Sequence, residues 1–190
     1  FIMKGEWCYY KQAFTPEECD LILNLGLQLQ QNDAKLGVAG DVSDNFYRRS
    51  KTRFILKEHP QFGWLFDKMW KMAIEANDTW FGFHISRISY IQLAEYDASY
   101  QGEYKKHHDV FWINGTNYHR KLSAVVQLSD PNDYEGGDLI LHTQNESPPK
   151  EIKNQGSVIF FPSFIEHQAH KVTKGTRYSL ACWFDGPKWR

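Results

Sequence analysis

The feature that most constrains the fold is a change of pattern near residue 84. From there to about residue 184, short runs of alternating or β-branched residues are separated by Gly, Pro, Asn and Asp. We expect strands at 86–96, 104–111, 121–128, 138–142, 157–161, 165–172 and 177–184. Many short strands in succession are typical of an antiparallel sandwich or barrel. The aromatic content of 16% also favours a β-rich core or a site lined with rings.

Two helices are expected before the strands. The run Thr15-Pro16-Glu17-Glu18 has the pattern of a capping box with proline at the first helical position. Its buried face is expected to contain Cys19, Ile22, Leu23, Gly26 and Leu29. Pro60 opens a second helical pattern that ends near Asn77. Between the helices, residues 36–50 predict a long loop and 52–56 a short strand.

The sequence therefore predicts a single domain, 1–190, of the α+β class and mainly β. Helical support at 14–77 would pack on one sheet of an antiparallel double-sheet roll at about 84–185, whose mouth is free for a site. No repeat or low-complexity tract interrupts it.

Charge and composition exclude several classes of protein. With 22 Lys and Arg against 23 Asp and Glu, the chain lacks the basic excess of a dedicated nucleic-acid-binding module. Its apolar runs stop at about four residues, whereas a membrane-spanning helix needs roughly 20. Three cysteines without a disulfide or zinc spacing, and a start with too short an apolar stretch for a signal peptide, predict a cytoplasmic protein.

A candidate metal site begins at His107-His108-Asp109. Residues two apart in a strand point to the same face, so the His107 imidazole and the Asp109 carboxylate can share a ligand. Downstream, His167 and His170 fall on opposite strand faces, so only one of them can point inward. Two histidines and one carboxylate make the facial triad of non-haem Fe(II) oxygenases, which leaves coordination positions open.

The last expected strand adds an anion site. Period two places Arg177, Ser179, Ala181 and Trp183 on one face, and Tyr178, Leu180, Cys182 and Phe184 on the other. An inward arginine requires an anion. Because a guanidinium captures a carboxylate with two parallel hydrogen bonds, these residues indicate a dicarboxylate cosubstrate.

From about Tyr90 to Trp183 the chain resembles the Fe(II)- and 2-oxoglutarate-dependent oxygenases, specifically their prolyl 4-hydroxylase-like branch. The resemblance rests on ordered phrases: Tyr104-x-x-His107-x-Asp109, the run 122–129 leading into Tyr134-Glu135-Gly136-Gly137-Asp138-Leu139, then 156–163, His167, and 172–180. The opening of the first helix at 14–19 also resembles the family's leading helix. The family's fold is the double-stranded β-helix, a jelly-roll of the cupin type.

The resemblance implies a role for each matching residue. His107, Asp109 and His167 would bind Fe(II), Arg177 would pair with the distal carboxylate of 2-oxoglutarate, and Ser179 would add a hydroxyl donor. It also implies that Gln127 contacts the same carboxylate, that Tyr96 lines the site, and that Trp183 lies beside the iron, with a core aromatic as the alternative for Trp183. The cosubstrates would be 2-oxoglutarate and O2, with ascorbate as a candidate reductant.

The implied reaction is hydroxylation of an aliphatic C–H bond, most simply in a prolyl residue of a peptide or protein, with release of succinate and CO2. Asp109 distinguishes the chain from the superfamily's halogenases, and Trp183 stands where the nucleic-acid demethylases carry a second arginine. Collagen-type enzymes commonly use lysine in the place of Arg177, so collagen-like repeats are not the default substrate.

Two alternatives stay open. One is hydroxylation of a free amino acid or another small molecule, and the other is a metal-binding scaffold without catalysis. The loop at 36–50 and the aromatic connection at 110–118 favour an adjustable, peptide-sized mouth. The basic residues Arg48, Arg49, Lys51, Arg53 and Lys57 are expected on a solvated face, with an acidic or main-chain-rich peptide as a candidate partner.

Overall fold

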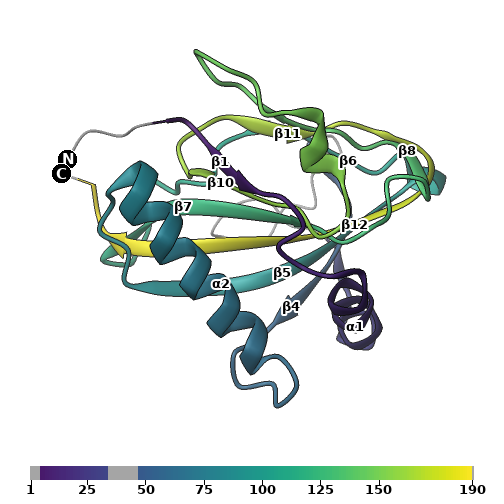
Figure 1. Cartoon of the computed structure of the whole chain (residues 1–190), viewed down its shortest axis with the longest axis horizontal. Helices are drawn as coiled ribbons and strands as arrows, with labels where there is room; N and C mark the ends of the chain where they lie inside the picture. Colours follow the sequence, from purple (N-terminus) through teal and green to yellow (C-terminus); the bar gives the residue numbers. More distant parts are fainter. Residues whose placement is uncertain (1–4, 34–46, 190) are drawn as a thin grey trace.

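The computed structural model describes residues 5–33 and 47–189 (Figure 1). Its two α-helices are α1 (Pro16–Gly26) and α2 (Gly63–Ala76), and α2 continues into a π-helical turn, Asn77–Phe81. The strands are β1 (Cys8–Tyr10), β2 (Asn32–Asp33), β3 (Arg48–Arg49), β4 (Lys51–Ile55), β5 (Arg87–Asp97), β6 (Glu103–His107), β7 (Tyr118–Gln127), β8 (Tyr134–Gly136), β9 (Leu139–Leu141), β10 (Val158–Pro162), β11 (His167–Ala169) and β12 (Val172–Pro187). Short 3-10 turns occupy Ala98–Tyr100 and Lys150–Lys153.

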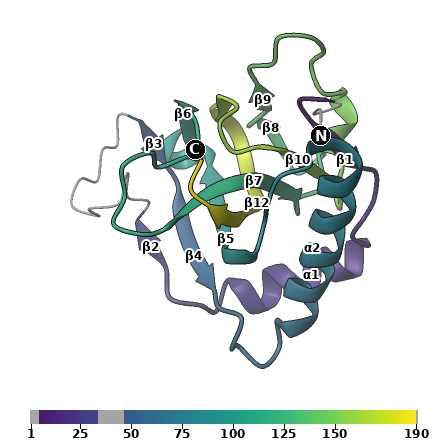
Figure 2. The same ribbon diagram turned by 90° about the vertical axis from the view of Figure 1, so that its left-hand side faces the viewer.

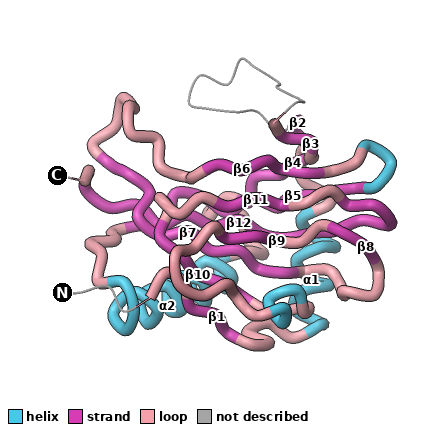
Figure 3. Tube along the Cα trace, turned by 90° about the horizontal axis from the view of Figure 1, so that it is seen from above, coloured by secondary structure: helices cyan, strands magenta, loops and turns pink. Residues whose placement is uncertain are grey.

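The strands form two antiparallel sheets. The larger has the order β1-β10-β7-β12-β5-β4-β2, with β8 paired to β12 beside this path, and the smaller has the order β3-β6-β11-β9. The small sheet lies over one face of the large sheet, and α1 and α2 cover the other face (Figures 2 and 3). This arrangement confirms the predicted mainly β fold with helices packed on one sheet. No helix among the described residues is long and apolar enough to cross a membrane.

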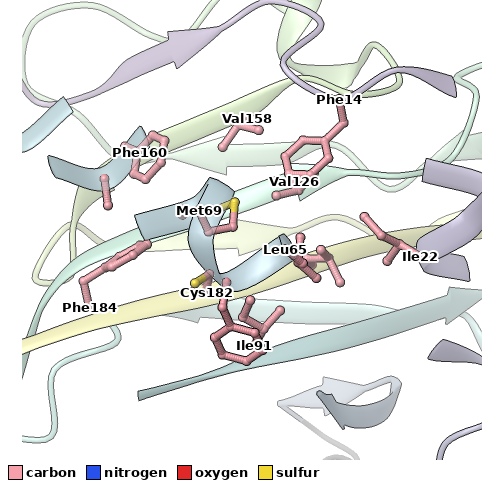
Figure 4. Close-up of a cluster of buried hydrophobic side chains, with 14 of the residues drawn as sticks. Phe14, Ile22, Leu65, Met69, Ile91, Val126, Val158, Phe160, Cys182 and Phe184 are labelled. Atoms are coloured by element: carbon pink, nitrogen blue, oxygen red, sulfur yellow. The ribbon is translucent and has the colours of Figure 1, made fainter. Parts of the chain in front are cut away.

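The main apolar core lies between the helices and the large sheet (Figure 4). It is built from fully buried side chains of both layers, including Phe14, Ile22, Leu65, Met69, Ile91, Val126, Phe160, Leu180 and Phe184. A Cβ on Gly26 would lie 2.7 Å from Leu93 Cδ2, so glycine is what lets the end of α1 approach the sheet closely. Two smaller clusters lie between the sheets and leave room there for polar side chains.

The local signals for α1 are confirmed, whereas α2 begins at Gly63 and not at the expected Pro60. Thr15 caps α1, with its hydroxyl accepting from the Glu18 amide at 3.2 Å and the Glu18 carboxylate accepting from the Thr15 amide at 2.9 Å. Lys68 of α2 donates to the same carboxylate at 2.7 Å, which links the two helices. Cys19, Ile22 and Gly26 are buried as expected.

Several boundaries differ from the sequence-based expectation. The loop predicted at 36–50 falls outside the described residues at 36–46, and its last part forms β3. The strand predicted at 104–111 ends at His107, so Asp109 follows the strand in a bend instead of continuing it. The very short strands β1, β2, β3 and β8 were not predicted, because two or three residues carry no periodicity.

Candidate active site

Three candidate ligands meet between the two sheets. His107 ends β6 and His167 begins β11, and the two residues are direct cross-strand partners. Asp109 reaches the same point from the bend after β6: its Oδ1 lies 3.7 Å from His107 Nε2, and its Oδ2 lies 3.6 Å from His167 Nε2. The three donor atoms lie within 4.8 Å of one another. The structure thus brings together the residues that the motif predicted, although a bend, not strand alternation, positions Asp109.

Backbone carbonyls orient both imidazoles. His107 Nδ1 lies 2.7 Å from the Lys105 carbonyl, and His167 Nδ1 lies 3.0 Å from the Ile165 carbonyl. A carbonyl can only accept, so each Nδ1 carries the proton and each Nε2 presents a lone pair to the common point. Burial, and then the neighbouring His167, lower the pKa of His107 below its ordinary value, which keeps this imidazole neutral and able to bind a metal.

Asp109 is held by a network of serines. The Ser123 hydroxyl donates to Asp109 Oδ2 at 2.7 Å and lies 2.9 Å from the Ser163 hydroxyl, while the Asp109 amide donates to the Ser163 carbonyl at 2.8 Å. Burial acts to raise the pKa of Asp109, but both imidazoles, Arg120 and the Ser123 hydrogen bond together hold it below its ordinary value. Two imidazole Nε2 atoms and a fixed carboxylate form a donor set that suits Fe(II).

A small cavity of about 50 Å³ extends from this point toward Arg177. All four residues that period two placed on the inner face of β12 line it, namely Arg177, Ser179, Ala181 and Trp183, and so does Tyr96. Arg177 is only 3% exposed, and its Nε donates to Gln127 Oε1 at 3.1 Å. The Gln127 amide in turn donates to the Tyr134 hydroxyl at 2.9 Å, so Gln127 orients the guanidinium.

The guanidinium end is packed from two further sides. Its Cζ lies 5.6 Å from the centre of the Tyr96 ring. A Cβ on Gly137, which has φ +65°, would lie 3.0 Å from Arg177 Cδ, so the glycine leaves space for the arginine. Arg177 and Ser179 thereby present donors to one end of the cavity while the triad occupies the other. A dicarboxylate has the matching chemistry.

On its outer side the triad opens into a groove of about 880 Å³. Trp183 forms part of its wall, where its ring packs edge-to-face with Tyr90 at 5.3 Å and lies 4.1 Å from the Arg120 guanidinium. Trp183 therefore lies at the cavity and not in the apolar core under the helices. Residues of the 110–118 connection, including Phe111 and Tyr118, line the outer part of the groove.

Three residues that line the groove were given no role in the site from the sequence, namely Arg48, Tyr104 and Arg120. Tyr104 stacks on His107 with ring centres 3.5 Å apart, and the Arg48 guanidinium lies 4.5 Å from the Tyr104 ring. Arg48 and Arg53 are 8% and 7% exposed, so the expectation of a solvated basic face is wrong for both. Arg120 escaped detection because a register shift leaves Lys121 without a partner on β12, and such a bulge reverses strand alternation.

Comparison with known proteins places this site in a family. The model of the 2OG-Fe(II) oxygenase superfamily matches residues 91–185, half of the chain. A PKHD-type hydroxylase from Prochlorococcus marinus is 43% identical over 63 residues, which cover 33% of this chain and 28% of that protein. One from Pseudoalteromonas atlantica is 39% identical over 93 residues, or 45% of this chain and 40% of that protein. The alignments thus span less than half the length of these curated relatives.

Solved structures support the fold. A Pseudomonas putida prolyl-4-hydroxylase superposes with a TM-score of 0.72 at 17% identity, covering 94% of this chain and 91% of that one. A Trichoplax adhaerens prolyl hydroxylase, solved with a peptide fragment of a hypoxia inducible factor, gives 0.74 at 18% identity and covers 94% and 83%. These similarities confirm the double-stranded β-helix. Because the family model spans half of the chain and includes every cavity-lining residue from Gln92 to Trp183, the chain belongs to the 2OG-Fe(II) oxygenase superfamily.

Proposed function

We propose that this protein is a dioxygenase that hydroxylates an aliphatic C–H bond of a prolyl residue in a peptide or protein. In this reaction 2-oxoglutarate, O2 and the C–H compound give succinate, CO2 and the alcohol. The observation that carries the proposal is the His107, Asp109 and His167 cluster, within 4.8 Å at the inner end of a groove, with a buried arginine behind it. Family membership implies Fe(II), 2-oxoglutarate and O2.

The metal would be held by the two Nε2 atoms and the Asp109 carboxylate, and when bound it supplies the activation of O2 that no side chain can perform. The protein contributes orientation. Carbonyl acceptors fix both imidazole tautomers, and the Ser123 hydroxyl fixes the carboxylate. These contacts hold the three donor groups in fixed orientations toward one point.

For the cosubstrate, we assign Arg177 and Ser179 to the distal carboxylate of 2-oxoglutarate. Gln127 is assigned to orientation, since its side-chain oxygen accepts from Arg177 and its amide is held by Tyr134. Tyr96 and Trp183 would wall the cavity and exclude water from the reacting groups. Burial of Arg177 to 3% exposure strengthens its attraction for the carboxylate relative to a surface site.

Two observations support a prolyl substrate: the two similar solved structures are prolyl hydroxylases, and the groove can accept a peptide. Both solved structures named above are described as prolyl hydroxylases, and one holds a peptide. The groove of about 880 Å³ is large enough to hold several residues of a peptide. Exposed Trp112 and Tyr118, 50% and 37% accessible, lie on the 110–118 segment beside it and offer aromatic surface to a peptide.

The proposal also covers the extent of the domain, the reductant and the cellular compartment. We infer that residues 1–190 work as one oxygenase unit, that ascorbate serves as reductant, and that the protein acts in the cytoplasm. Cys8, Cys19 and Cys182 are free and buried, which is compatible with a reducing compartment.

The test is anaerobic titration of the metal-free protein with Fe(II) and 2-oxoglutarate, followed by admission of O2. We expect a visible metal-to-ligand charge-transfer band that decays as succinate forms, and then a mass gain of one oxygen atom in proline-containing peptides. His167→Ala should lose the band and succinate formation. His170→Ala is the matched control, because that imidazole is exposed on the other side of the same segment, and it should keep both.

Two outcomes would overturn the proposal. A folded protein that binds Fe(II) but gives neither band nor succinate would be the non-catalytic scaffold. A protein that forms succinate and oxidises free proline or another small acid, but no peptide, would be a small-molecule hydroxylase.

A further inference from the structure

The arginines that the structure describes divide into two groups by their partners. Arg49, Arg53 and Arg87 each form an ion pair with a carboxylate, from Glu103, Glu95 and Asp185 respectively. Arg48, Arg120 and Arg177 line the cavities beside the triad. Among the described residues, no carboxylate lies within ion-pair distance of these three. Arg87 also lines the outer groove, but Asp185 neutralises it. Arg48, Arg120 and Arg177 are the described arginines at the site without a carboxylate partner.

Arg48, like Arg177, is a buried arginine whose contacts are with neutral groups. It is 8% exposed, its Nε donates to the Ser50 hydroxyl at 2.7 Å, and its Nη2 donates to Gln92 Oε1 at 2.9 Å. The Cζ of its guanidinium lies 4.5 Å from the centre of the Tyr104 ring. All three partners are neutral. Burial of a guanidinium among neutral groups is costly unless an anion completes the site.

Arg120 differs because rings surround it. Its guanidinium lies 4.1 Å from Trp183, 4.9 Å from Phe111 and 5.3 Å from Tyr90, and it donates to the Tyr90 hydroxyl. Aromatic faces partly compensate a buried cation. Arg177 is already assigned to the cosubstrate. Within residues 5–33 and 47–189, this leaves Arg48 as the groove cation that has neither a carboxylate partner nor several surrounding rings.

The position of Arg48 connects it to the reacting end of the groove. It lines both the outer groove and the inner cavity, and it contacts the Tyr104 ring that stacks on His107. An anion on Arg48 would therefore lie one aromatic ring away from the triad. Two of the N–H groups of Arg48 are used by Ser50 and Gln92, and no side chain in the described part of the chain takes up its other Nη hydrogens, which can donate to a ligand.

We propose that the groove selects a substrate that carries a carboxylate close to the reacting carbon, and that Arg48 is the residue that binds this carboxylate. A carboxylate matches one guanidinium in charge and in its planar pair of oxygens. The inference rests on the proposed function, which it sharpens from a prolyl substrate to an acidic one. The carboxylate can belong to an acidic residue beside the proline of a peptide or to the main chain of a small acid.

The experiment measures equilibrium binding to the zinc-loaded protein with 2-oxoglutarate present, so that no turnover occurs. One pair of probes is a blocked proline pentapeptide with glutamate next to the proline, and the same peptide with glutamine. The other pair is N-acetylproline and N-acetylprolinamide. We expect the acid of at least one pair to bind about tenfold or more tightly than its neutral partner. The pair that shows the preference identifies the source of the carboxylate.

Variants then assign the preference to Arg48. Arg48→Gln should bind both members of the pair equally. Gln92→Glu keeps the shape of the side chain and supplies an internal carboxylate 2.9 Å from Arg48 Nη2, so it should remove the preference without removing the arginine. Arg49→Gln is the matched control: it deletes the neighbouring arginine, which pairs with Glu103, and should keep the preference. Gln92→Glu also keeps the test valid where Arg48→Gln lowers the melting temperature.

The proposal is overturned if neither acid binds more tightly than its neutral partner, or if the preference survives in both Arg48→Gln and Gln92→Glu. Failure of the proposed function gives a different result. A wild-type protein that forms no succinate with Fe(II) and 2-oxoglutarate is no oxygenase, whatever the binding measurements show. One that hydroxylates a small acid but no peptide is a small-molecule hydroxylase, even where Arg48 provides the preference for the acid.

Discussion

The two faces of β12 are both largely buried, but one packs in the apolar core and the other lines the cavity of the site. Tyr178, Leu180, Cys182 and Phe184 point under the helices into an apolar cluster, and burial raises the pKa of the Cys182 thiol so that it stays protonated. Arg177, Ser179, Ala181 and Trp183 point between the sheets and line the cavity of the site. The difference shows that one strand can stabilise the fold with one set of side chains while it carries a candidate binding site with the other.

The two faces also differ in whether their buried groups have suitable partners. On the helix side, burial alone is favourable, because the side chains are apolar and closely packed. On the cavity side, Arg177 is nearly as buried as Leu180 but has only neutral partners. We therefore expect substitutions on the helix face to change the free energy of unfolding, and substitutions on the cavity face to change ligand binding.

The largest expected effect is that of Leu180→Ala. Leu180 is fully buried between the helices and the sheet, so its truncation leaves a cavity and should lower the free energy of unfolding by about 3 kcal/mol. Denaturant unfolding of the metal-free protein measures this. The dissociation constant for 2-oxoglutarate, measured on the folded zinc-loaded protein, should stay within about twofold. A large loss of affinity would mean that the two faces are coupled.

Arg177→Met should show the reverse pattern. Loss of a buried, charge-assisted pair should weaken 2-oxoglutarate binding by about 100-fold, which corresponds to roughly 2.7 kcal/mol. The free energy of unfolding without ligand should be unchanged or higher, because an unpaired buried charge has been replaced by an apolar side chain of similar length. Calorimetric titration and denaturant unfolding test the two halves separately. A marked loss of stability in the absence of ligand would contradict this view of the cavity face.

Ser179→Ala is the milder change on the same face. Removal of one hydroxyl donor should weaken 2-oxoglutarate binding about fivefold, near 1 kcal/mol, with little change in stability. Ala181, the next inner residue on the strand, provides the control: Ala181→Ser adds a hydroxyl and should not restore affinity in the Ser179→Ala background, because it lies one step further from Arg177. Restoration would show that the hydroxyl position is not specific.

The parts of the molecule that were predictable from sequence depend on local rules. The capping box at Thr15 and Glu18 is a pattern of adjacent residues, and it forms as predicted. The two faces of β12 follow from strand alternation over a long strand, and all eight side chains lie as expected. The ordered motif phrases predicted that His107, Asp109 and His167 share a site, and in the structure their ligand atoms lie within 4.8 Å of one another.

The residues that were missed depend on contacts distant in sequence. Arg48 enters the site because β3 pairs with β6, more than fifty residues later, and a two-residue strand carries no signal of that pairing. Arg120 is turned into the groove by the irregular register beside Lys121. Arg120 lies just before the strand expected at 121–128, and a bulge at its start is specified by the partner strand as well as by its own residues.

The smallest expected effect concerns the helical layer that covers the apolar face. Partial burial acts to raise the pKa of Glu18, but the hydrogen bonds from Lys68 and from the Thr15 amide outweigh it and hold the pKa below the ordinary 4.5. A carboxylate with a lowered native pKa contributes stability above its unfolded pKa and loses it as the pH falls through the native value. Glu18→Gln should therefore lower the free energy of unfolding by about 0.5–1 kcal/mol at pH 7, and the difference should shrink below pH 4.5. Denaturant unfolding at both pH values measures it, and Glu17→Gln, one residue earlier at an exposed position, is the control. A difference that persists at low pH would mean that packing of the Glu18 stem, and not its charge, joins α1 to α2.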